Sequence, residues 1–294
     1  MRKIDAPRVF ASARPGALPL PGDRKLQAFT PPNVLDRYGD AAAGVRAVSK
    51  GDNVITMFDS IGEDFWSGGG ITAKKVSSQL RAIGDRDVEV QINSYGGDMF
   101  EGIAIYNVLR EHPQNITVKV MGMAASAASI IAMAGDTIEI GAASFLMIHN
   151  CWVWAAGNRH DLAETAAWLE PFDVAMAEVY AAKSGADSAQ IVKWMDTETY
   201  MSGSMAVERG FADALLPADQ ITTDEDAKAA DQSVNELRAM ELALVASGLT
   251  RTQARAKIKN LKGTPGAAAD QVITPGADDR KLNQALAGLL ANLS

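Results

Sequence analysis

Two serines, Ser126 and Ser129, stand where an apolar strand should give way to a helix, in the stretch VMGMAASAASIIAMAG. Small residues around Ser126 would let a substrate backbone pass close to its hydroxyl, and a helix N-terminus favours a developing negative charge. These are the requirements of a serine nucleophile, although the Gly-x-Ser-x-Gly pattern of a nucleophile elbow is absent. A serine that only caps a tightly packed helix is the alternative interpretation.

A histidine and two carboxylates could supply the acid–base chemistry that such a serine needs. His149 ends the apolar stretch FLMIH, and a general base must be an imidazole or its equivalent within hydrogen-bond reach of the hydroxyl. His112 and His160 are expected at the surface, and His149 itself could be purely structural. Asp196 and Glu198 are two residues apart, so in an extended segment both point the same way. Either could orient the imidazole, with a solvated acidic loop as the alternative.

A glycine pair, Gly96 and Gly97, lies between an expected strand and an expected helix in INSYGGDMFEG. Paired glycines permit positive φ and the close approach of another chain. A free N–H on Gly97 could then bind an oxyanion. The alternative is an ordinary strand-to-helix turn in which Asp98 caps the helix.

The elements that must position these residues alternate between strand and helix from residue 53 to about residue 216. Strands are expected in NVITMF, VEVQINS, NITVKVMG and FLMIH, and helices in TAKKVSSQLRAIG, DMFEGIAIYNVLREHP and the long segment 159–185. This alternation predicts βαβ units and an α/β fold with a largely parallel sheet.

The composition changes on both sides of this predicted domain, which spans residues 51–216. Residues 1–50 are rich in Pro, Gly, Ala and Arg and are expected to form a loosely ordered arm. Residues 217–294 are expected to form a linker and a helical tail, beginning with a polar, acidic linker at 217–232. Two short helices, a second linker and a final amphipathic helix would follow.

The overall composition excludes several classes of protein. The 294 residues carry a net charge of −8, which argues against a general nucleic-acid binder. One cysteine excludes an internal disulfide and a Cys-rich metal site, and three histidines leave little for a His-based metal centre. No run of about 18 apolar residues predicts a membrane span. The N-terminus lacks the apolar core of a signal peptide, so a cytoplasmic protein is expected.

The order glycine pair, serine, histidine, acid resembles the proteolytic subunit of the Clp protease family. The resemblance is closer still to the Clp-type prohead (head maturation) proteases of tailed phages and prophages. The matching segments are INSYGGDMFEGIAIYNVLR, GMAASAASIIAMAG, FLMIHN and YMSGSMAVERGFADALL, and they cover roughly residues 53–216. The resemblance implies a ClpP/crotonase-like fold, a repeated ββα superhelix with a parallel sheet. The two terminal extensions lie outside the resemblance, and their composition predicts that they are partly disordered.

The same resemblance implies roles for individual residues. Ser126 would be the nucleophile, His149 the general base, and the backbone N–H groups of Gly97 and Ala127 the oxyanion hole. Ser129 would fall inside the following helix and be structural.

The sequence departs from the family at the acid. The family places an aspartate two residues before an aromatic-apolar-Ser run, and here the run Tyr200-Met201-Ser202 puts Glu198 at that position. Glu198 is therefore the preferred acid, with Asp196 as the alternative if the loop is displaced. Tyr95 is a second departure, because many relatives carry proline before the glycine pair. This change should alter the substrate-side strand and leave the chemistry intact.

The implied function is ATP-independent hydrolysis of peptide bonds by a serine endopeptidase that needs no metal or nucleotide. No Gly-x-x-x-x-Gly-Lys-Ser/Thr loop is present, so ATP-driven unfolding would require a separate partner. Members of the family form homo-oligomeric rings. The prohead branch implies phage capsid or scaffold proteins as substrates, in the host cytoplasm or the prohead. Self-cleavage near 217–232 or 263–280 is a further expectation, and no nucleic-acid or membrane partner is expected.

Three alternatives remain open from the sequence. One is a Ser-Lys protease like the signal peptide peptidases, for which Lys119, Lys183 and Lys193 are candidates by residue type only. Another is thioester chemistry on a crotonase-like fold. The third is a ring-forming structural or scaffold homologue whose triad is broken at Glu198. Cys151 is disfavoured as a nucleophile because no turn presents it.

Overall fold

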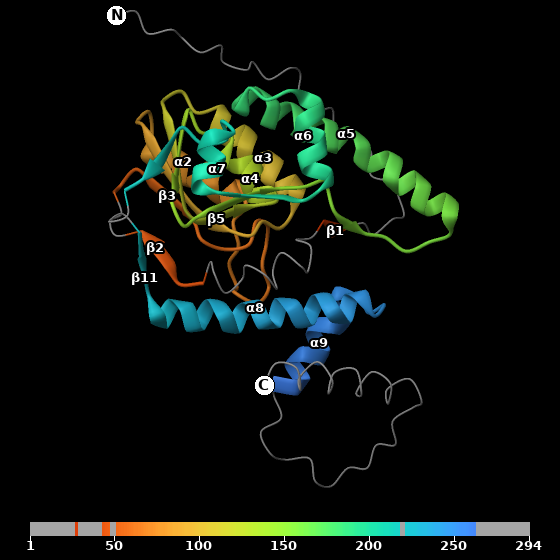
Figure 1. Ribbon diagram of the computed structural model, residues 1–294. Coiled ribbons are helices and arrows are strands. Elements are labelled where there is room, and N and C mark those ends of the chain that lie inside the picture. Colours follow the sequence, from red (N-terminus) through yellow and green to blue (C-terminus); the bar gives the residue numbers. More distant parts are fainter. Residues whose placement is uncertain (1–26, 29–42, 48–50, 218–220, 263–294) are drawn as a thin grey trace, which may run out of the picture. The chain divides into compact units, whose positions relative to one another are not determined.

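The computed structural model describes residues 27–28, 43–47, 51–217 and 221–262 (Figure 1). Most of the predicted N-terminal arm, the second predicted linker and the predicted final helix lie outside these residues. The chain divides into two compact units, Met1–Ala239 and Met240–Ser294. Among the described residues, no helix combines the length and apolar character that crossing a membrane requires.

A seven-stranded sheet forms the centre of the first unit. Its strands are β3 (Val54–Met57), β4 (Val88–Ser94), β5 (Ile116–Ala125), β6 (Thr137–Gly141), β7 (Phe145–Ile148), β9 (Thr199–Ser202) and β10 (Ala214–Leu216). The order β10-β6-β5-β4-β3 is parallel throughout, β7 pairs in parallel with β5, and β9 runs antiparallel to β7. The predicted α/β fold with a largely parallel sheet is therefore confirmed.

The long strand β5 changes partner along its length, and this change positions the site. Residues 117–120 pair with β6, whereas residues 123–125 pair with β7. The carboxyl ends of β5 and β7 consequently lie side by side, and Ala125 pairs with Met147. Each strand is followed at that edge by one of the candidate residues, because Ser126 follows β5 and His149 follows β7.

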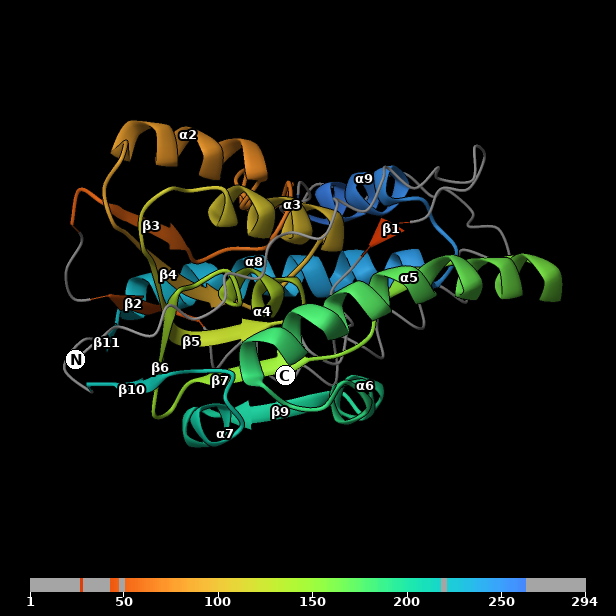
Figure 2. The ribbon, with the colours of Figure 1, turned by 90° about the horizontal axis from the view of Figure 1, so that it is seen from above.

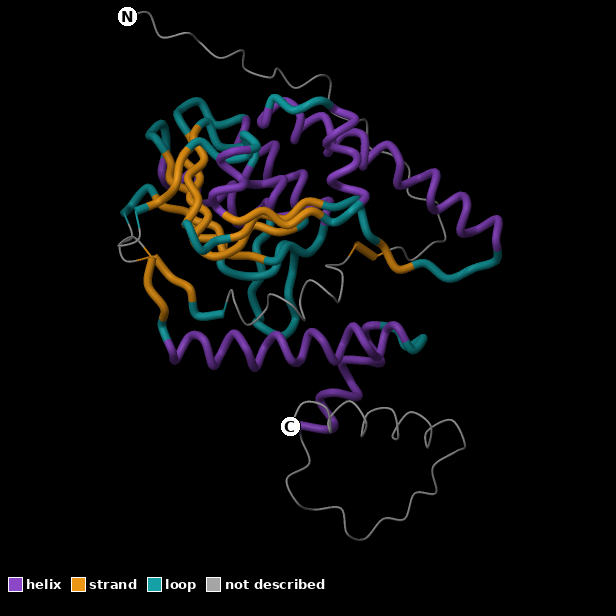
Figure 3. The backbone as a smooth tube through the Cα atoms, in the orientation of Figure 1, coloured by secondary structure: helices purple, strands orange, loops and turns teal. Residues whose placement is uncertain are grey.

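Helices cover one face of the sheet (Figures 2 and 3). They are α2 (Ala73–Ile83), α3 (Met99–Arg110), α4 (Ala127–Ala132), α5 (Arg159–Ser184), α6 (Ser188–Asp196) and α7 (Gly203–Glu208). Thr72 caps α2, and Asp98 caps α3 by accepting from the N–H groups of Phe100 and Glu101. The N-terminal part of α5 extends beyond the sheet in Figures 1 and 2.

The core lies between the sheet and these helices. It contains the buried strand residues Val90, Ile92, Val118, Val120, Ile138 and Ile140 and the helix residues Ile105, Leu109 and Ile131. Strands that are buried on both faces read as nearly continuous apolar runs, as β4 and β5 do. Burial of each such aliphatic side chain contributes roughly 1.5–3 kcal/mol, so the core holds the strand ends firmly in place.

The structure differs from the predicted linker at 217–232. Residues Ile221–Thr223 form β11, which pairs antiparallel with β2 (Val45–Ala47), and α8 (Glu225–Ala246) begins directly afterwards. Asp224 accepts from Ala227 N at the start of α8, and the acidic Glu225 and Asp226 occupy its first turn. Acidic residues stabilise a helix N-terminus, so here the polar composition belongs to an exposed helix start.

The remaining elements are short or belong to the second unit. A two-residue strand, β1 (Gln27–Ala28), pairs antiparallel with β8 (Val153–Trp154). In the second unit the end of α8 is joined to α9 (Arg251–Lys262), and the buried Glu241 binds both Arg251 and Arg255.

Candidate active site

Ser126 occupies a strained turn between β5 and α4. Its φ is 55° and its ψ is −126°, a region that L-residues rarely adopt and that costs of the order of 1–3 kcal/mol. The Ser126 N–H donates to Met147 O at 3.0 Å, which fixes the turn against β7. Ser126 occupies the N-cap position of α4, but its side chain makes no capping hydrogen bond, so capping does not account for the hydroxyl. A strained strand-to-helix turn of this kind presents a serine hydroxyl.

The Ser126 hydroxyl hydrogen bonds with His149. Oγ of Ser126 lies 2.7 Å from Nε2 of His149, and the imidazole is only 7% exposed. Burial lowers the pKa of His149 to about 4, and the nearby charge of Glu198 opposes this effect only in part. The imidazole is therefore neutral at pH 7, and its Nε2 can accept the serine proton when Nδ1 carries the ring hydrogen.

Glu198 lies beside His149 as a result of the strand register. Strands β7 and β9 are antiparallel with Ile148 opposite Thr199, so the next residues outward are His149 and Glu198. Glu198 has a φ of 46° and donates its N–H to Met195 O at 3.1 Å, in the turn that joins α6 to β9. Its carboxylate acts electrostatically on the imidazole, raising the pKa of His149 against the larger effect of burial.

Asp196 has a different partner. It is the last residue of α6, and its Oδ1 accepts from Asn150 Nδ2 at 2.8 Å. The expectation that Asp196 and Glu198 point the same way assumed an extended segment, and that assumption is wrong because the helix continues to Asp196. The structure thus brings Glu198, and not Asp196, to the imidazole.

The glycine pair lies against both Ser126 and the loop that precedes α2. Ile61 N donates to Gly96 O at 2.9 Å, and Asp98 N donates to Ile61 O at 2.8 Å. These two bonds bracket Gly97, so its own N–H points away from Ile61. A Cβ on Gly97 would lie 2.1 Å from Ile61 O, and a Cβ on Gly96 would lie 2.7 Å from Ser126 Cβ. Only glycine fits at either position.

One small cavity unites the predicted residues. Gly97, Ser126, Ala127 and His149 all line it, and its volume is about 20 Å³. No described residue accepts the N–H of Gly97 or the N–H of Ala127, which is the first residue of α4. The cavity therefore combines a hydroxyl, a neutral imidazole and two available N–H donors. Apolar side chains complete the wall, among them Met99, Ile103, Ile130 and Met176.

The alternative chemical groups are placed elsewhere. Burial, and then the neighbouring Asp173, raise the pKa of the Cys151 thiol, so it stays protonated. Lys119 pairs with Glu89 at 2.9 Å, and Lys183 pairs with Asp213 at 3.1 Å. Lys193 is exposed on α6. None of the three lysines hydrogen bonds with Ser126 in the described part of the chain.

Two further residues support the Ser126 turn. Ser129 is fully buried, and its Oγ donates to Ser126 O at 2.6 Å, which agrees with a structural role. The same Oγ lies 2.7 Å from the hydroxyl of Tyr180, which acts as the donor because Ser129 already uses its proton. Sequence reasoning missed Tyr180, since nothing in a long helix marks one tyrosine as the partner of a serine 51 residues away.

Comparison with known proteins identifies the family of this chain. The family described as Clp protease matches residues 70–219, which is just over half of the chain. The ATP-dependent Clp protease proteolytic subunit of Ligilactobacillus salivarius is 26% identical over 193 residues, covering 63% of this chain and 94% of that protein. Proteolytic subunit 3 of Rhodococcus jostii is 30% identical over 134 residues, covering 45% of this chain and 66% of that protein.

A solved structure of a ClpP1 mutant from Listeria monocytogenes is also similar. It has a TM-score of 0.49 and 20% sequence identity, and the match covers 57% of this chain and 94% of that chain. The match to the family over residues 70–219 includes the glycine pair, Ser126, His149 and Glu198. The chain therefore belongs to the Clp protease family of ClpP-like serine peptidases.

Proposed function

We propose that this protein is a serine endopeptidase that hydrolyses peptide bonds through Ser126, His149 and Glu198. The observation that carries the proposal is the 2.7 Å hydrogen bond between Ser126 Oγ and His149 Nε2. A serine in a strained turn, bonded to a neutral imidazole beside two available N–H groups, meets the geometric requirements of acyl transfer.

The reaction begins when His149 Nε2 takes the proton of Ser126 as Oγ attacks the scissile carbonyl carbon. The negative oxygen of the tetrahedral intermediate accepts hydrogen bonds from Gly97 N and Ala127 N. His149 then gives its proton to the leaving amine, and the acyl group remains on Ser126. Water, deprotonated by the same imidazole, hydrolyses the acyl-enzyme and regenerates the serine.

Glu198 acts on the imidazolium that forms during each transfer. Burial makes a charged His149 unfavourable, as its lowered pKa of about 4 indicates. A carboxylate beside the ring offsets part of this cost when the ring is protonated. Glu198 supplies that negative charge, and Asp196 remains the alternative acid of lower rank because it binds Asn150.

These steps use no nucleotide, so we propose that peptide hydrolysis itself is ATP-independent. The named relatives are proteolytic subunits of ATP-dependent proteases. We also propose that the chain assembles into a homo-oligomeric ring. Its membership of the Clp protease family supports this assignment.

The substrates that we propose are capsid or scaffold proteins of a phage head, processed in the host cytoplasm or the prohead. The resemblance of the four quoted motif segments to prohead proteases supports this part of the proposal. Self-cleavage within 217–232 would require β11 and the first turn of α8 to unfold, because proteases bind extended chains. The other proposed segment, 263–280, lies outside the described residues.

The experiment that tests the activity is hydrolysis of an unstructured protein such as casein without nucleotide, with product peptides identified by mass spectrometry. The wild-type chain should release peptides, whereas Ser126→Ala and His149→Ala should not. Equal product formation by the wild type and Ser126→Ala would contradict the proposal. Co-expression with phage capsid and scaffold proteins, again against Ser126→Ala, tests the substrate class.

A further inference from the structure

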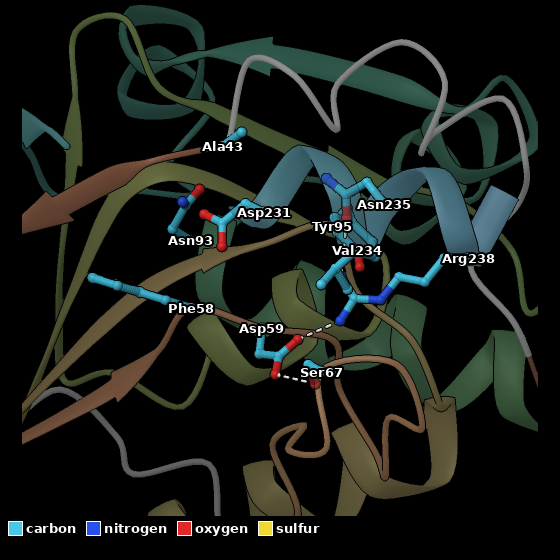
Figure 4. Close-up of a pocket in the computed structure, with 10 residues that line it drawn as sticks. All are labelled: Ala43, Phe58, Asp59, Ser67, Asn93, Tyr95, Asp231, Val234, Asn235 and Arg238. Carbon is cyan, nitrogen blue, oxygen red and sulfur yellow. Dashed lines mark hydrogen bonds and ion pairs between the residues drawn. The ribbon is translucent and has the colours of Figure 1, made fainter. Parts of the chain in front are cut away.

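A largely buried arginine on α8 binds the loop that precedes α2. Arg238 belongs to the first compact unit and is only 12% exposed. Its Nη2 lies 2.5 Å from Asp59 Oδ1 and 3.0 Å from Asp64 Oδ2, and its Nε lies 3.1 Å from Asp64 Oδ1. Figure 4 shows the side chain reaching from α8 to Asp59. One guanidinium thus neutralises two largely buried carboxylates.

The two carboxylates in turn shape the loop of residues 59–71. Oδ2 of Asp59 accepts from Ser67 Oγ and from Gly70 N, both at 2.9 Å. Oδ2 of Asp64 accepts from Ser67 N at 2.7 Å. Removal of the Arg238 charge would leave both carboxylates buried without their cation, which is strongly unfavourable. The loop would have to open to hydrate them.

The loop contacts the glycine pair through Ile61. The backbone of Ile61 bonds to Gly96 O at 2.9 Å and to Asp98 N at 2.8 Å, one on each side of Gly97. Because a Cβ on Gly97 would lie 2.1 Å from Ile61 O, these backbones are in direct contact with no intervening side chain. Any shift of Ile61 therefore moves the N–H of Gly97.

Arg238 also contacts the glycine strand directly, through Tyr95. Its guanidinium carbon lies 5.5 Å from the centre of the Tyr95 ring, within the range of a cation–π interaction. Tyr95 is 7% exposed and immediately precedes Gly96. Its buried hydroxyl has no hydrogen-bond partner among the described residues, so the ring is fixed by its packing and by Arg238. Tyr95 and Arg238 both line a pocket of about 100 Å³.

We propose that Arg238 is a positioning residue for the proposed oxyanion donor, the N–H of Gly97. It acts along two routes, through the loop of residues 59–71 and through Tyr95, and both converge on Gly96 and Gly97. This inference rests on the proposed function. According to this inference, the part of α8 up to Arg238 is needed for catalysis, although α8 comes after the candidate triad in the sequence.

The test compares Arg238→Gln and Arg238→Lys with the wild type in the full-length chain. Arg86→Gln is the matched control, because it removes an exposed arginine paired with Asp52 at 2.9 Å. Each protein reacts with a fluorophosphonate probe. The final stoichiometry of labelling at Ser126 reports the fraction of chains that can react, and circular dichroism reports the folded fraction. The rate constant, corrected for the folded fraction, reports the oxyanion hole. The kcat and KM values for a short peptide are measured in parallel.

Arg238→Gln should reach the wild-type stoichiometry with a rate constant about 10- to 100-fold lower, and kcat should fall more than KM changes. Arg238→Lys should recover part of the labelling rate constant, because lysine keeps the positive charge but lacks the planar guanidinium that bonds to two carboxylates at once. Arg86→Gln should match the wild type. An Arg238→Gln rate constant equal to the wild type would overturn the inference. The inference would also be overturned if Arg238→Gln has a lowered Tm and a lower final stoichiometry of labelling but an unchanged rate constant. That result would assign Arg238 only a structural role.

If Arg238→Gln does not fold, Asp64→Asn provides the second variant. It keeps the shape of the side chain and removes one charge from the cluster. Asp64→Asn should therefore also reach the wild-type stoichiometry of labelling with a lowered rate constant. A wild-type rate for Asp64→Asn would overturn the inference. Absence of labelling in the folded wild type would instead overturn the proposed function and this inference with it. The two failures are therefore distinguishable.

Discussion

Ser126 and Glu198 share a positive φ. They are the two non-glycine residues with positive φ among the described residues, at 55° and 46°. Ser126 follows β5 and Glu198 precedes β9. His149 is the neighbour of both, and it follows β7, the strand that pairs with β5 and with β9. Strained residues persist where the surroundings over-determine them, and they gather at functional sites. The strain therefore marks both ends of the candidate triad.

Replacement of Glu198 should separate the two candidate acids. Glu198→Gln keeps the size of the side chain and removes the charge beside His149, so kcat/KM should fall by about 10²- to 10⁴-fold. Asp196→Asn retains an acceptor for Asn150 on the exposed end of α6 and should change kcat/KM by less than about threefold. Steady-state kinetics on one peptide substrate measure both. A larger loss in Asp196→Asn would assign the acid role to Asp196.

The pH dependence of activity should extend to unusually acidic pH. A general base must be neutral, and burial lowers the pKa of His149 to about 4. The acidic limb of kcat/KM should therefore lie near pH 4, with circular dichroism as the check that the protein stays folded. Glu198 raises this pKa, so Glu198→Gln should move the limb to lower pH. A limb near pH 6.5 in the wild type would contradict the buried, neutral imidazole.

The same shift of the His149 pKa predicts a contribution to stability. The unfolded chain binds a proton at His149 near pH 6.5, whereas the folded chain binds it only near pH 4. Stability is consequently lost as pH falls through this window, by roughly 3 kcal/mol in total. Urea unfolding at pH 7 and pH 4.5 measures the loss. His149→Gln should lose less stability than the wild type over the same interval, and an equal loss would contradict the prediction.

Gly97→Ala should be far more damaging than Gly185→Ala. Both glycines have positive φ, 151° and 71°, so both substitutions strain the backbone. A Cβ at Gly185 meets no atom within 4 Å, whereas one at Gly97 meets Ile61 O at 2.1 Å. We expect a loss of about 1 kcal/mol for Gly185→Ala and at least twice that for Gly97→Ala, from denaturant unfolding. If the two variants lost similar amounts of unfolding free energy, the backbone at Ile61 would be able to move away from an added Cβ at low cost.

Ser129 and Tyr180 should behave as a coupled pair. Ser129→Ala leaves the buried Tyr180 hydroxyl without this partner and should cost about 1–3 kcal/mol. Tyr180→Phe removes the other hydroxyl, so the double variant should lose less than the sum of the single variants. A double-mutant cycle from urea unfolding measures the coupling. Strict additivity would contradict the hydrogen bond at 2.7 Å.

The sequence predicts the strand-to-helix alternation and the parallel sheet, because apolar periodicity and the glycine turns carry that information. It does not predict that β5 changes partner from β6 to β7, which brings Ser126 beside His149. The choice between the acids depends on one helix boundary. Since α6 continues to Asp196, that carboxylate pairs with Asn150, and Glu198 is the acid whose charge acts on His149. Boundaries of this kind are decided by tertiary packing.

The C-terminal region shows why composition alone is insufficient. The acidic run near residue 225 is typical of a linker, but acidic residues also favour the start of a helix, and α8 begins there. Arg238 meets Asp59 across 179 residues of sequence. A single sequence carries no signal for such a pair, since each residue alone reads as an exposed charge.

The most direct test of the account is covalent labelling of the folded protein with a fluorophosphonate probe, followed by intact mass and peptide mapping. We expect one adduct per chain on Ser126, its absence in Ser126→Ala, and strongly slowed labelling in His149→Ala. No adduct on well-folded wild-type protein, or an adduct that persists in Ser126→Ala, would contradict the central claim that Ser126 is an activated nucleophile.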